Sequence, residues 1–234
     1  MKKKDIIYLI KLFVIIFLFF NINLLIIPVL NLFGIDSLLY DGADIAYLNA
    51  LDELILFVVV YLLYHKDFKR DFNNFKLNSK NNFSRICYYF AMCLAIKIGF
   101  SFLTGVLSMI FGVEIGSSEN QNIINSITNS APFIMLISTS LLAPFVEEGI
   151  FRLGFKKVFK EKYTFIIISG LVFGLMHIFP TDLPFYVALI QSIVYVAMGI
   201  YLAYIYDQSD NIWISIIIHA LNNFISIIAL LTIY

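Results

Sequence analysis

The chain has 234 residues, of which 61% are hydrophobic and 14% charged, and its formal net charge is zero. This composition is too apolar for an ordinary soluble domain, and without a basic excess we expect no nucleic-acid partner. Several apolar runs reach the roughly 20 residues that a helix needs to cross a bilayer. The composition therefore predicts an all-α, polytopic integral membrane protein, with residues 1–234 forming a single transmembrane domain.

Hydropathy predicts seven membrane-spanning helices, at about residues 6–33, 45–64, 86–112, 131–155, 163–179, 184–206 and 211–233. Residues 65–85 are basic and rich in Asn, which predicts a cytoplasmic loop or a short helix lying on anionic lipid. Residues 116–130 are rich in Ser, Asn, Gln and Thr, which predicts an external loop. The residues of chemical interest lie between about 131 and 230, whereas residues 1–130 have the pattern of generic membrane helices.

The basic residues of the loops cluster in alternate loops, and this predicts the orientation of the chain; Lys11, Lys97 and Arg152 lie within apolar segments. The clusters occur at residues 2–4, 66–85 and 156–162, whereas the intervening loops contain Asp36, Asp41, Asp44, Glu114, Glu119 and Asp182 without Lys or Arg. The positive-inside rule then places the N-terminus in the cytoplasm. Because the predicted number of spans is odd, the C-terminal Tyr234 lies outside.

The second and third predicted spans carry charges of opposite sign at similar depths. Asp52 and Glu53 lie in the second span and Lys97 in the third, and the helical rise places both near mid-membrane. The simplest structural explanation is an ion pair between the two helices. The alternative is a role in positioning a substrate.

The fourth predicted span contains two adjacent glutamates followed by an arginine. Glu148 and Arg152 are i,i+4 neighbours in the favourable order, so they are expected to form an ion pair. Glu147 lies about 100° further round the helix and is left free for other work, such as acting as a general base. A purely structural ion pair that ends the helix would explain Glu148 and Arg152, but it leaves Glu147 without a partner.

The fifth predicted span combines two glycines with a histidine. Gly170 and Gly174 form a small-xxx-small face that lets another helix approach closely. His177 is seven residues beyond Gly170 and lies on nearly the same stripe. His177 is therefore expected to point at a neighbouring helix instead of lipid.

The seventh predicted span carries a polar stripe in an otherwise apolar segment. His219 and Asn223 are i,i+4 neighbours and can act together as hydrogen-bond donors to a developing oxyanion. Ser215, Asn222 and Ser226 share this stripe, and hydrogen bonding between helices is sufficient to explain them.

Together these groups fit the hydrolysis of a peptide bond in two ways. A carboxylate base, two histidines and an amide can activate a water molecule and stabilise a tetrahedral intermediate without a metal. Alternatively, Glu147, His177 and His219 can bind Zn²⁺ and leave one position open for water. There is no His-Glu-x-x-His motif, so a zinc site would depend on the three helices converging.

The three motifs together resemble a known family. Glu147-Glu148-x-x-x-Arg152, Phe173-x-x-x-His177 and His219-x-x-x-Asn223 resemble the motifs of the CAAX-protease and bacteriocin-processing (Abi, CPBP) family of intramembrane endopeptidases. Their order, their spacing and their placement on three separate late spans all match.

This resemblance implies a membrane protease in which Glu147 is the general base and His177 helps to hold the attacking water. It also implies that His219 and Asn223 form the oxyanion site, with Glu148 and Arg152 in support. The family has been described both as metal-dependent and as glutamate-based without metal, so Zn²⁺ and no cofactor both stay open. The implied substrate is a hydrophobic or lipidated peptide or protein. The implied roles are peptide maturation or bacteriocin self-immunity, and the lysine-rich loops look like those of a bacterial cell-membrane protein.

Two other functions are compatible with these residues. One is a membrane binding or immunity protein that keeps the fold without hydrolysis. The other is an ion-coupled transporter, in which intramembrane charges are also expected, but no inverted repeat is visible.

The predicted spans place His177 nearer the outer surface than Glu147. We therefore predict that residues 178–183 dip into the membrane, lower His177 to the level of Glu147 and line a wet cavity. This site would open toward the cytoplasm or laterally to lipid.

Overall fold

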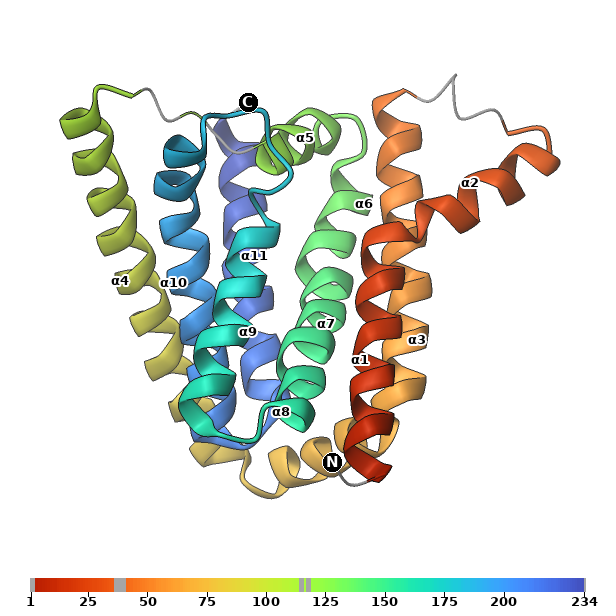
Figure 1. Ribbon diagram of the computed structural model, residues 1–234, viewed down its shortest axis with the longest axis vertical. Coiled ribbons are helices and arrows are strands. Elements are labelled where there is room, and N and C mark those ends of the chain that lie inside the picture. Colours follow the sequence, from red (N-terminus) through yellow and green to blue (C-terminus); the bar gives the residue numbers. More distant parts are fainter. Residues whose placement is uncertain (1–2, 36–40, 114–115, 117–118, 234) are drawn as a thin grey trace.

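The computed structural model describes residues 3–35, 41–113, 116 and 119–233. Over these ranges the chain is a bundle of helices without strands, which confirms the all-α membrane fold (Figure 1). The long helices are α1 (Lys3–Asn21), α3 (Gly42–Leu77), α4 (Ser79–Phe111), α10 (Phe185–Ser209) and α11 (Ile212–Ile233). Four residues of the orientation argument, Lys2, Asp36, Glu114 and Tyr234, lie outside the described ranges.

The number of membrane crossings stays a prediction. Among the described residues, five helical stretches are long and apolar enough to cross a membrane: α3, α4, the composite helix Pro132–Val158, α10 and α11. The predicted first span is divided into α1 and α2 (Asn23–Leu32), which meet at a bend of 52° and would count as a sixth crossing together. The predicted fifth span contains α9 (Lys162–Met176), an apolar helix of only 15 residues. In Figure 1, α11 finishes at the end of the bundle opposite the start of α1.

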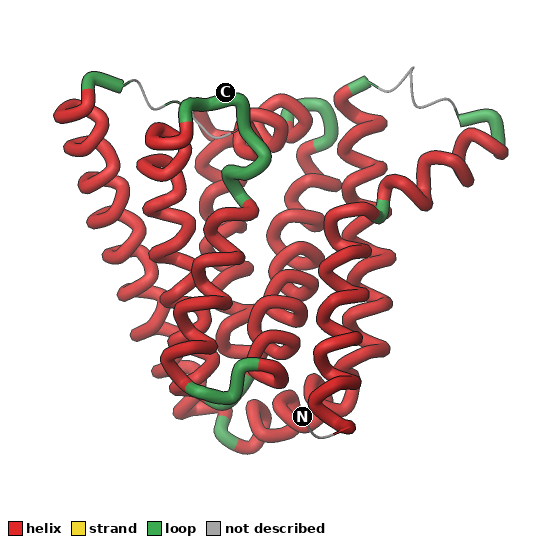
Figure 2. The backbone as a smooth tube through the Cα atoms, in the orientation of Figure 1, coloured by secondary structure: helices red, strands yellow, loops and turns green. Residues whose placement is uncertain are grey.

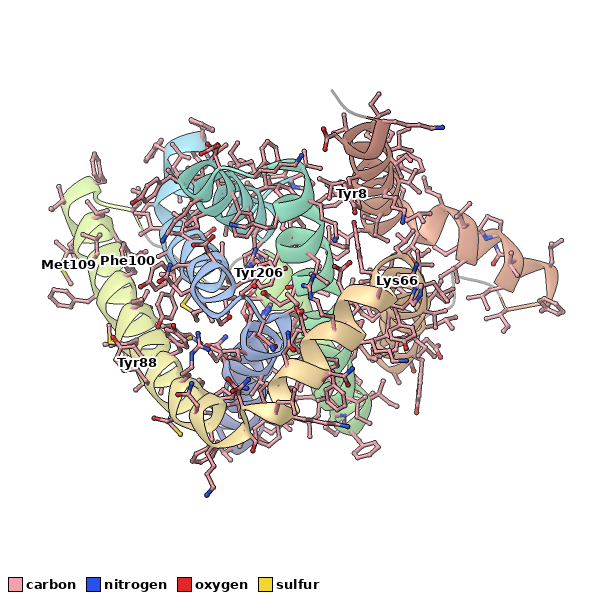
Figure 3. The ribbon with its side chains drawn as sticks, turned by 90° about the horizontal axis from the view of Figure 1, so that it is seen from below. Tyr8, Lys66, Tyr88, Phe100, Met109 and Tyr206 are labelled. Atoms are coloured by element: carbon pink, nitrogen blue, oxygen red, sulfur yellow. The ribbon has the colours of Figure 1, made fainter. Side chains whose placement is uncertain are left out.

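The basic segment at residues 65–85 is helical. α3 changes direction at Tyr64, whose φ of −124° is not helical, and continues to Leu77 before α4 begins at Ser79. Seen from below, this segment crosses the end of the bundle, with Lys66 near its start, while α4 runs along one edge (Figure 3). Of the two predictions for this segment, a cytoplasmic loop or a short helix, the structure shows a helix. Contact of this helix with anionic lipid stays a prediction.

The predicted external loop at residues 116–130 is wrong in part, because α5 (Glu119–Thr128) occupies most of it. The polar composition of this segment concealed an apolar side. Ile124 and Ile127 pack with Ala46 and Met135 in a small core separate from the main one. Burial of this side explains why a sequence of low helical propensity is helical here.

The fourth predicted span is a composite of α6 (Pro132–Ile137), α7 (Ala143–Glu148) and α8 (Phe155–Val158), joined by π-helical stretches at Ser138–Leu142 and Gly149–Gly154. The first π-helical stretch precedes Pro144, which lacks the N–H that an α-helix would use at this point. Phe145 fixes α7 against α3, since its ring centroid lies 4.4 Å from that of Phe68 and 4.3 Å from that of Phe57. The two adjacent glutamates are therefore held on a rigid, buried segment.

α9 and α10 pack closely through glycine, as the small-xxx-small face predicted. A Cβ atom at Gly170 would collide with Ile200, and one at Gly174 with the backbone of Val196. Gly199 of α10 returns the contact, because its Cβ would meet the carbonyl oxygen of Gly170. α9 stops well short of the end of the bundle at which α10 starts, and an irregular loop covers the remaining distance (Figure 2). The predicted dip of residues 178–183 into the membrane stays a prediction.

Candidate active site

Glu148 and Arg152 form a fully buried ion pair, as their spacing predicted. Arg152 Nε lies 3.1 Å from Glu148 Oε2, and both side chains are 0% exposed. Arg152 Nη1 also donates a hydrogen bond to Ser169 Oγ at 2.9 Å, and Ser169 in turn donates to the Phe151 carbonyl. The guanidinium group lies 4.6 Å from the ring centroid of Phe173. The pair is thus held against α9, through Ser169 and Phe173, and has no direct access to solvent.

His219 connects the two glutamates. Its Nδ1 atom lies 3.1 Å from Glu148 Oε1, and because a carboxylate oxygen only accepts, Nδ1 is the donor. Its Nε2 atom then faces Glu147, whose Oε2 lies 3.6 Å away. Ser215, one turn earlier on α11, donates to Glu148 Oε2. Glu148 therefore orients the imidazole ring, as carboxylates that accept a hydrogen bond from functional histidines do in other proteins.

His177 is the C-cap of α9 and is held by a backbone group and two rings. Its Nδ1 atom lies 2.8 Å from the Phe173 carbonyl oxygen, so Nδ1 donates and Nε2 keeps its lone pair. The imidazole stacks on Tyr195 of α10 at a centroid distance of 5.2 Å. The Phe173 ring lies between the two histidines, 4.7 Å from His177 and 5.6 Å from His219. Both histidines are therefore held with Nε2 as the unclaimed ring nitrogen.

Asn223 is positioned by a chain of hydrogen bonds. Its Nδ2 atom donates to the Thr139 carbonyl oxygen at 3.0 Å, and its Oδ1 atom accepts from Asn222 Nδ2 at 3.1 Å. Asn222 Oδ1 in turn accepts from Lys97 Nζ at 3.2 Å. The second proton of the Asn223 amide is left for another acceptor. Thr139 lies in the first π-helical stretch, so this irregular backbone directly supports the asparagine.

One cavity of about 650 Å³ brings four of the six candidate residues together. Glu147, His177, His219 and Asn223 line it, whereas Glu148 and Arg152 lie behind this wall. No hydrogen bond joins Glu147 to His177 directly, so their cooperation requires a bridging molecule within the cavity. The lining reaches Gln121 and Ile124 of α5, at the end of the bundle opposite the N-terminus. The predicted opening of the site toward the cytoplasm or laterally to lipid stays a prediction.

The predicted ion pair between the second and third spans is wrong. Asp52, Glu53 and Lys97 all line the cavity, but Lys97 Nζ binds the neutral side chains of Asn222 and Ser226 instead of a carboxylate. The charges lie at compatible depths, but their partners depend on how each helix is rotated about its axis and on the position of α11. The helical rise, which predicts depth, carries no information about rotation or about neighbouring helices.

A zinc site formed by Glu147, His177 and His219 is the alternative hypothesis from the sequence. Hydrogen-bonded Nδ1 atoms with a free Nε2 are typical of metal-binding histidines. However, within the described ranges no group of three or more His, Cys, Asp or Glu side chains is placed to hold a metal ion. The side-chain arrangement seen here therefore does not fit a three-ligand zinc site.

Two supporting residues, Ser169 and Tyr195, were not predicted from the sequence. Ser169 precedes Gly170 and reaches Arg152, and Tyr195 covers His177. A serine beside a small-xxx-small face could have been noticed, since polar side chains at such close helix contacts commonly bond across them. Nothing in the spacing of the sixth predicted span distinguished Tyr195 from the other aromatic residues there.

Comparison with known proteins agrees with this geometry. Residues 129–225 match the family model described as "Type II CAAX prenyl endopeptidase Rce1-like". The chain is 32% identical over 117 residues to "Putative membrane peptidase YdiL" of Bacillus subtilis (strain 168), covering 49% of this chain and 43% of that protein. It is 31% identical over 142 residues to "UPF0177 protein YvdC" of Lactococcus lactis subsp. lactis (strain IL1403), covering 58% of this chain and 52% of that protein.

The chain thus spans about half the length of the curated relatives it matches. No solved structure is significantly similar to it. The matched region begins just before α6 and ends within α11, so it contains all six candidate residues. The resemblance indicated by the three motifs is confirmed as a similarity: residues 129–225 are similar to the Rce1-like type II CAAX prenyl endopeptidases.

Proposed function

We propose that this chain is an intramembrane endopeptidase that hydrolyses a peptide bond with water activated by Glu147 and His177. One observation carries the proposal. Glu147 Oε2 has no hydrogen-bond partner and lies 3.6 Å from His219 Nε2, on the wall of a cavity shared with His177 and Asn223. A carboxylate left unsatisfied beside two oriented histidines is suited to take a proton from a bound molecule.

The first step is attack by water on the peptide carbonyl. His177 Nε2 is an acceptor because Nδ1 donates to Phe173, so it can hold one proton of the water. Glu147 removes the other proton as the oxygen attacks the carbonyl carbon. No hydrogen bond joins Glu147 to His177 directly, so we place the attacking water between them. There it can give one proton to Glu147 and form a hydrogen bond with His177.

The second step is the collapse of the tetrahedral intermediate. The free N–H of the Asn223 amide is a donor available to the oxyanion in this cavity, and His219 is its proposed second member because Nε2 faces the same space. Glu148 and Arg152 support His219 from behind. When the C–N bond breaks, Glu147 returns its proton to the leaving amine nitrogen, so that the products are a carboxylic acid and an amine.

The natural substrate in this setting is a hydrophobic or lipidated peptide. Phe19, Phe20, Ile22, Leu56, Met135 and Val194 are among the apolar residues that line the cavity, and such a wall favours apolar side chains or an acyl or prenyl chain. A role in peptide maturation or bacteriocin self-immunity is a finer part of this proposal. It would follow if the products are short peptides released at the membrane.

The test is cleavage in membranes of co-expressed apolar candidate peptides, with the products identified by mass spectrometry. Wild type is compared with Glu147→Gln and His177→Ala, and with Glu161→Gln as a matched control for loss of an exposed carboxylate outside the cavity. We expect products from wild type and Glu161→Gln only, with losses of about 10²-fold or more in the two site variants.

Different results would support other functions. If all four proteins are folded and none cleaves a broad peptide set, hydrolysis is refuted and a binding or immunity role becomes the better explanation. Peptide-independent ion flux that is lost in Glu147→Gln would instead indicate transport.

A further inference from the structure

The cavity has a second charged wall that lies outside the region matched by the family model. Asp52 and Glu53 of α3 contribute it, and Lys97 of α4 lines the same cavity. Since Lys97 binds Asn222 and Ser226, it does not neutralise either acidic residue. We call Asp52 and Glu53 the acidic wall.

Asp52 is buried and Glu53 is partly buried, and each has one carboxyl oxygen without a hydrogen-bond partner. Asp52 is only 7% exposed, and its Oδ1 atom has no hydrogen-bond partner, while its carboxyl group has an interaction with the Asn23 side chain. Glu53 Oε2 is likewise buried without a partner, and Glu53 lines the same cavity as Glu147. Buried carboxylates are normally paired or hydrogen-bonded, because losing hydration without compensation costs free energy. Three carboxyl oxygens of one cavity are therefore able to accept hydrogen bonds from a bound molecule.

The occupant of the cavity can donate these hydrogen bonds. Asp52, Glu53 and Glu147 place three carboxylates on the lining, against the single ammonium group of Lys97. A positively charged group is attracted by this distribution, and an acidic one is repelled. A lysine ammonium has three N–H donors and an arginine guanidinium has five, so either can satisfy both residues of the acidic wall at once. A hydroxyl group has one donor and cannot.

We propose that the acidic wall is a specificity subsite that binds a lysine or arginine side chain of the substrate, close to the bond that is cleaved. This inference rests on the proposed peptidase function, because the subsite is defined by the substrate of that reaction. Binding of a peptide can nevertheless be measured without cleavage. The preferred substrate is then an apolar segment with one basic residue. Its aliphatic stem would lie along the apolar lining while its charged end reaches α3.

The test uses two apolar peptides that differ at one position, lysine in one and the uncharged isostere norleucine in the other. Binding and cleavage of both are measured with the full chain in lipid nanodiscs, for wild type, Asp52→Asn/Glu53→Gln and the control Glu161→Gln. Wild type and the control should bind the lysine peptide about tenfold or more tightly than the norleucine peptide. The double variant should lose this preference through weaker binding of the lysine peptide, with norleucine binding unchanged.

Each result has a distinct meaning. Equal weakening for both peptides, or an unchanged preference in the double variant, would overturn the subsite. Charge-dependent binding without any cleavage would uphold the subsite and refute the peptidase function, and cleavage without charge preference would do the reverse. A folding defect is separated by the melting temperature without peptide, which should be equal or higher in the double variant because unpaired buried charges have been removed.

Discussion

Replacing Arg152 by methionine should destabilise the protein more than replacing Arg152 and Glu148 together. Both side chains are 0% exposed and their charged atoms lie 3.1 Å apart. Arg152→Met leaves the Glu148 carboxylate with Ser215 and His219 but without its cation. Leaving one member of a buried ion pair uncompensated costs about 3–5 kcal/mol of the free energy of unfolding.

The double variant Glu148→Gln/Arg152→Met removes both charges and keeps side chains of similar size. Because the attraction within a buried pair is largely offset by the loss of hydration, removing both partners is often close to neutral. The glutamine oxygen can still accept the hydrogen bond of His219. We therefore expect the double variant to recover at least half of the stability lost in Arg152→Met, or about 2 kcal/mol. The coupling energy of the pair then exceeds this recovery by the loss measured for Glu148→Gln alone.

The assay is reversible unfolding in mixed micelles for wild type, both single variants and the double variant. Peptide cleavage by the same four proteins reports whether His219 keeps its orientation, and we expect it to stay low in both variants that lack Glu148. Additive losses, with the double variant less stable than either single variant, would refute the view that the two residues act as one buried pair.

Three further predictions concern the surroundings of the site. Gly174→Leu should destabilise the protein by about 1–3 kcal/mol or more in thermal unfolding and lower the rate of cleavage, because a side chain there meets the backbone of Val196. Gly105→Leu is the control, since a Cβ there meets nothing within 4 Å, and it should change neither the stability nor the rate. Tyr195→Ala should lower kcat up to about tenfold at constant melting temperature, since His177 loses its stacked ring; an unchanged kcat would mean that the Phe173 hydrogen bond alone holds the imidazole. Dialysis against a chelator should change the cleavage rate by less than about twofold; a loss that zinc restores would show that His177 moves to join Glu147 and His219 around a metal.

The sequence predicted the buried pair and the converging histidines because their chemistry leaves few alternatives in an apolar helix. Glu148 and Arg152 are neighbours on one helix, so their spacing alone determines the contact. The face containing Gly170 and Gly174 likewise identified a helix contact, although not which helix fills it. Patterns within one helix were therefore reliable guides.

Contacts between helices were much harder to predict. Lys97 was assigned to Asp52 and Glu53 by depth, but the rotation of α4 turns it toward Asn222 and Ser226 instead. The helix α5 was missed because its stability comes from the packing of Ile124 and Ile127, which its polar composition concealed. The roles of the six candidate residues stay predictions, since the structure gives their positions and not their reactivity.

The shortness of α9 has a consequence for the lipid around the protein. At 1.5 Å per residue its 15 residues extend about 22 Å, against a hydrocarbon thickness of roughly 30 Å. Such hydrophobic mismatch is relieved when the bilayer becomes thinner beside the short helix. Headgroups and solvent then approach the C-terminal end of α9, where His177 stands. A substrate helix that arrives along this side would meet hydrated surroundings at the level of the site and could unwind there at lower cost, because its freed backbone groups would find water. The short length of α9 would thus bring water close to the site and favour an extended conformation of the substrate peptide there.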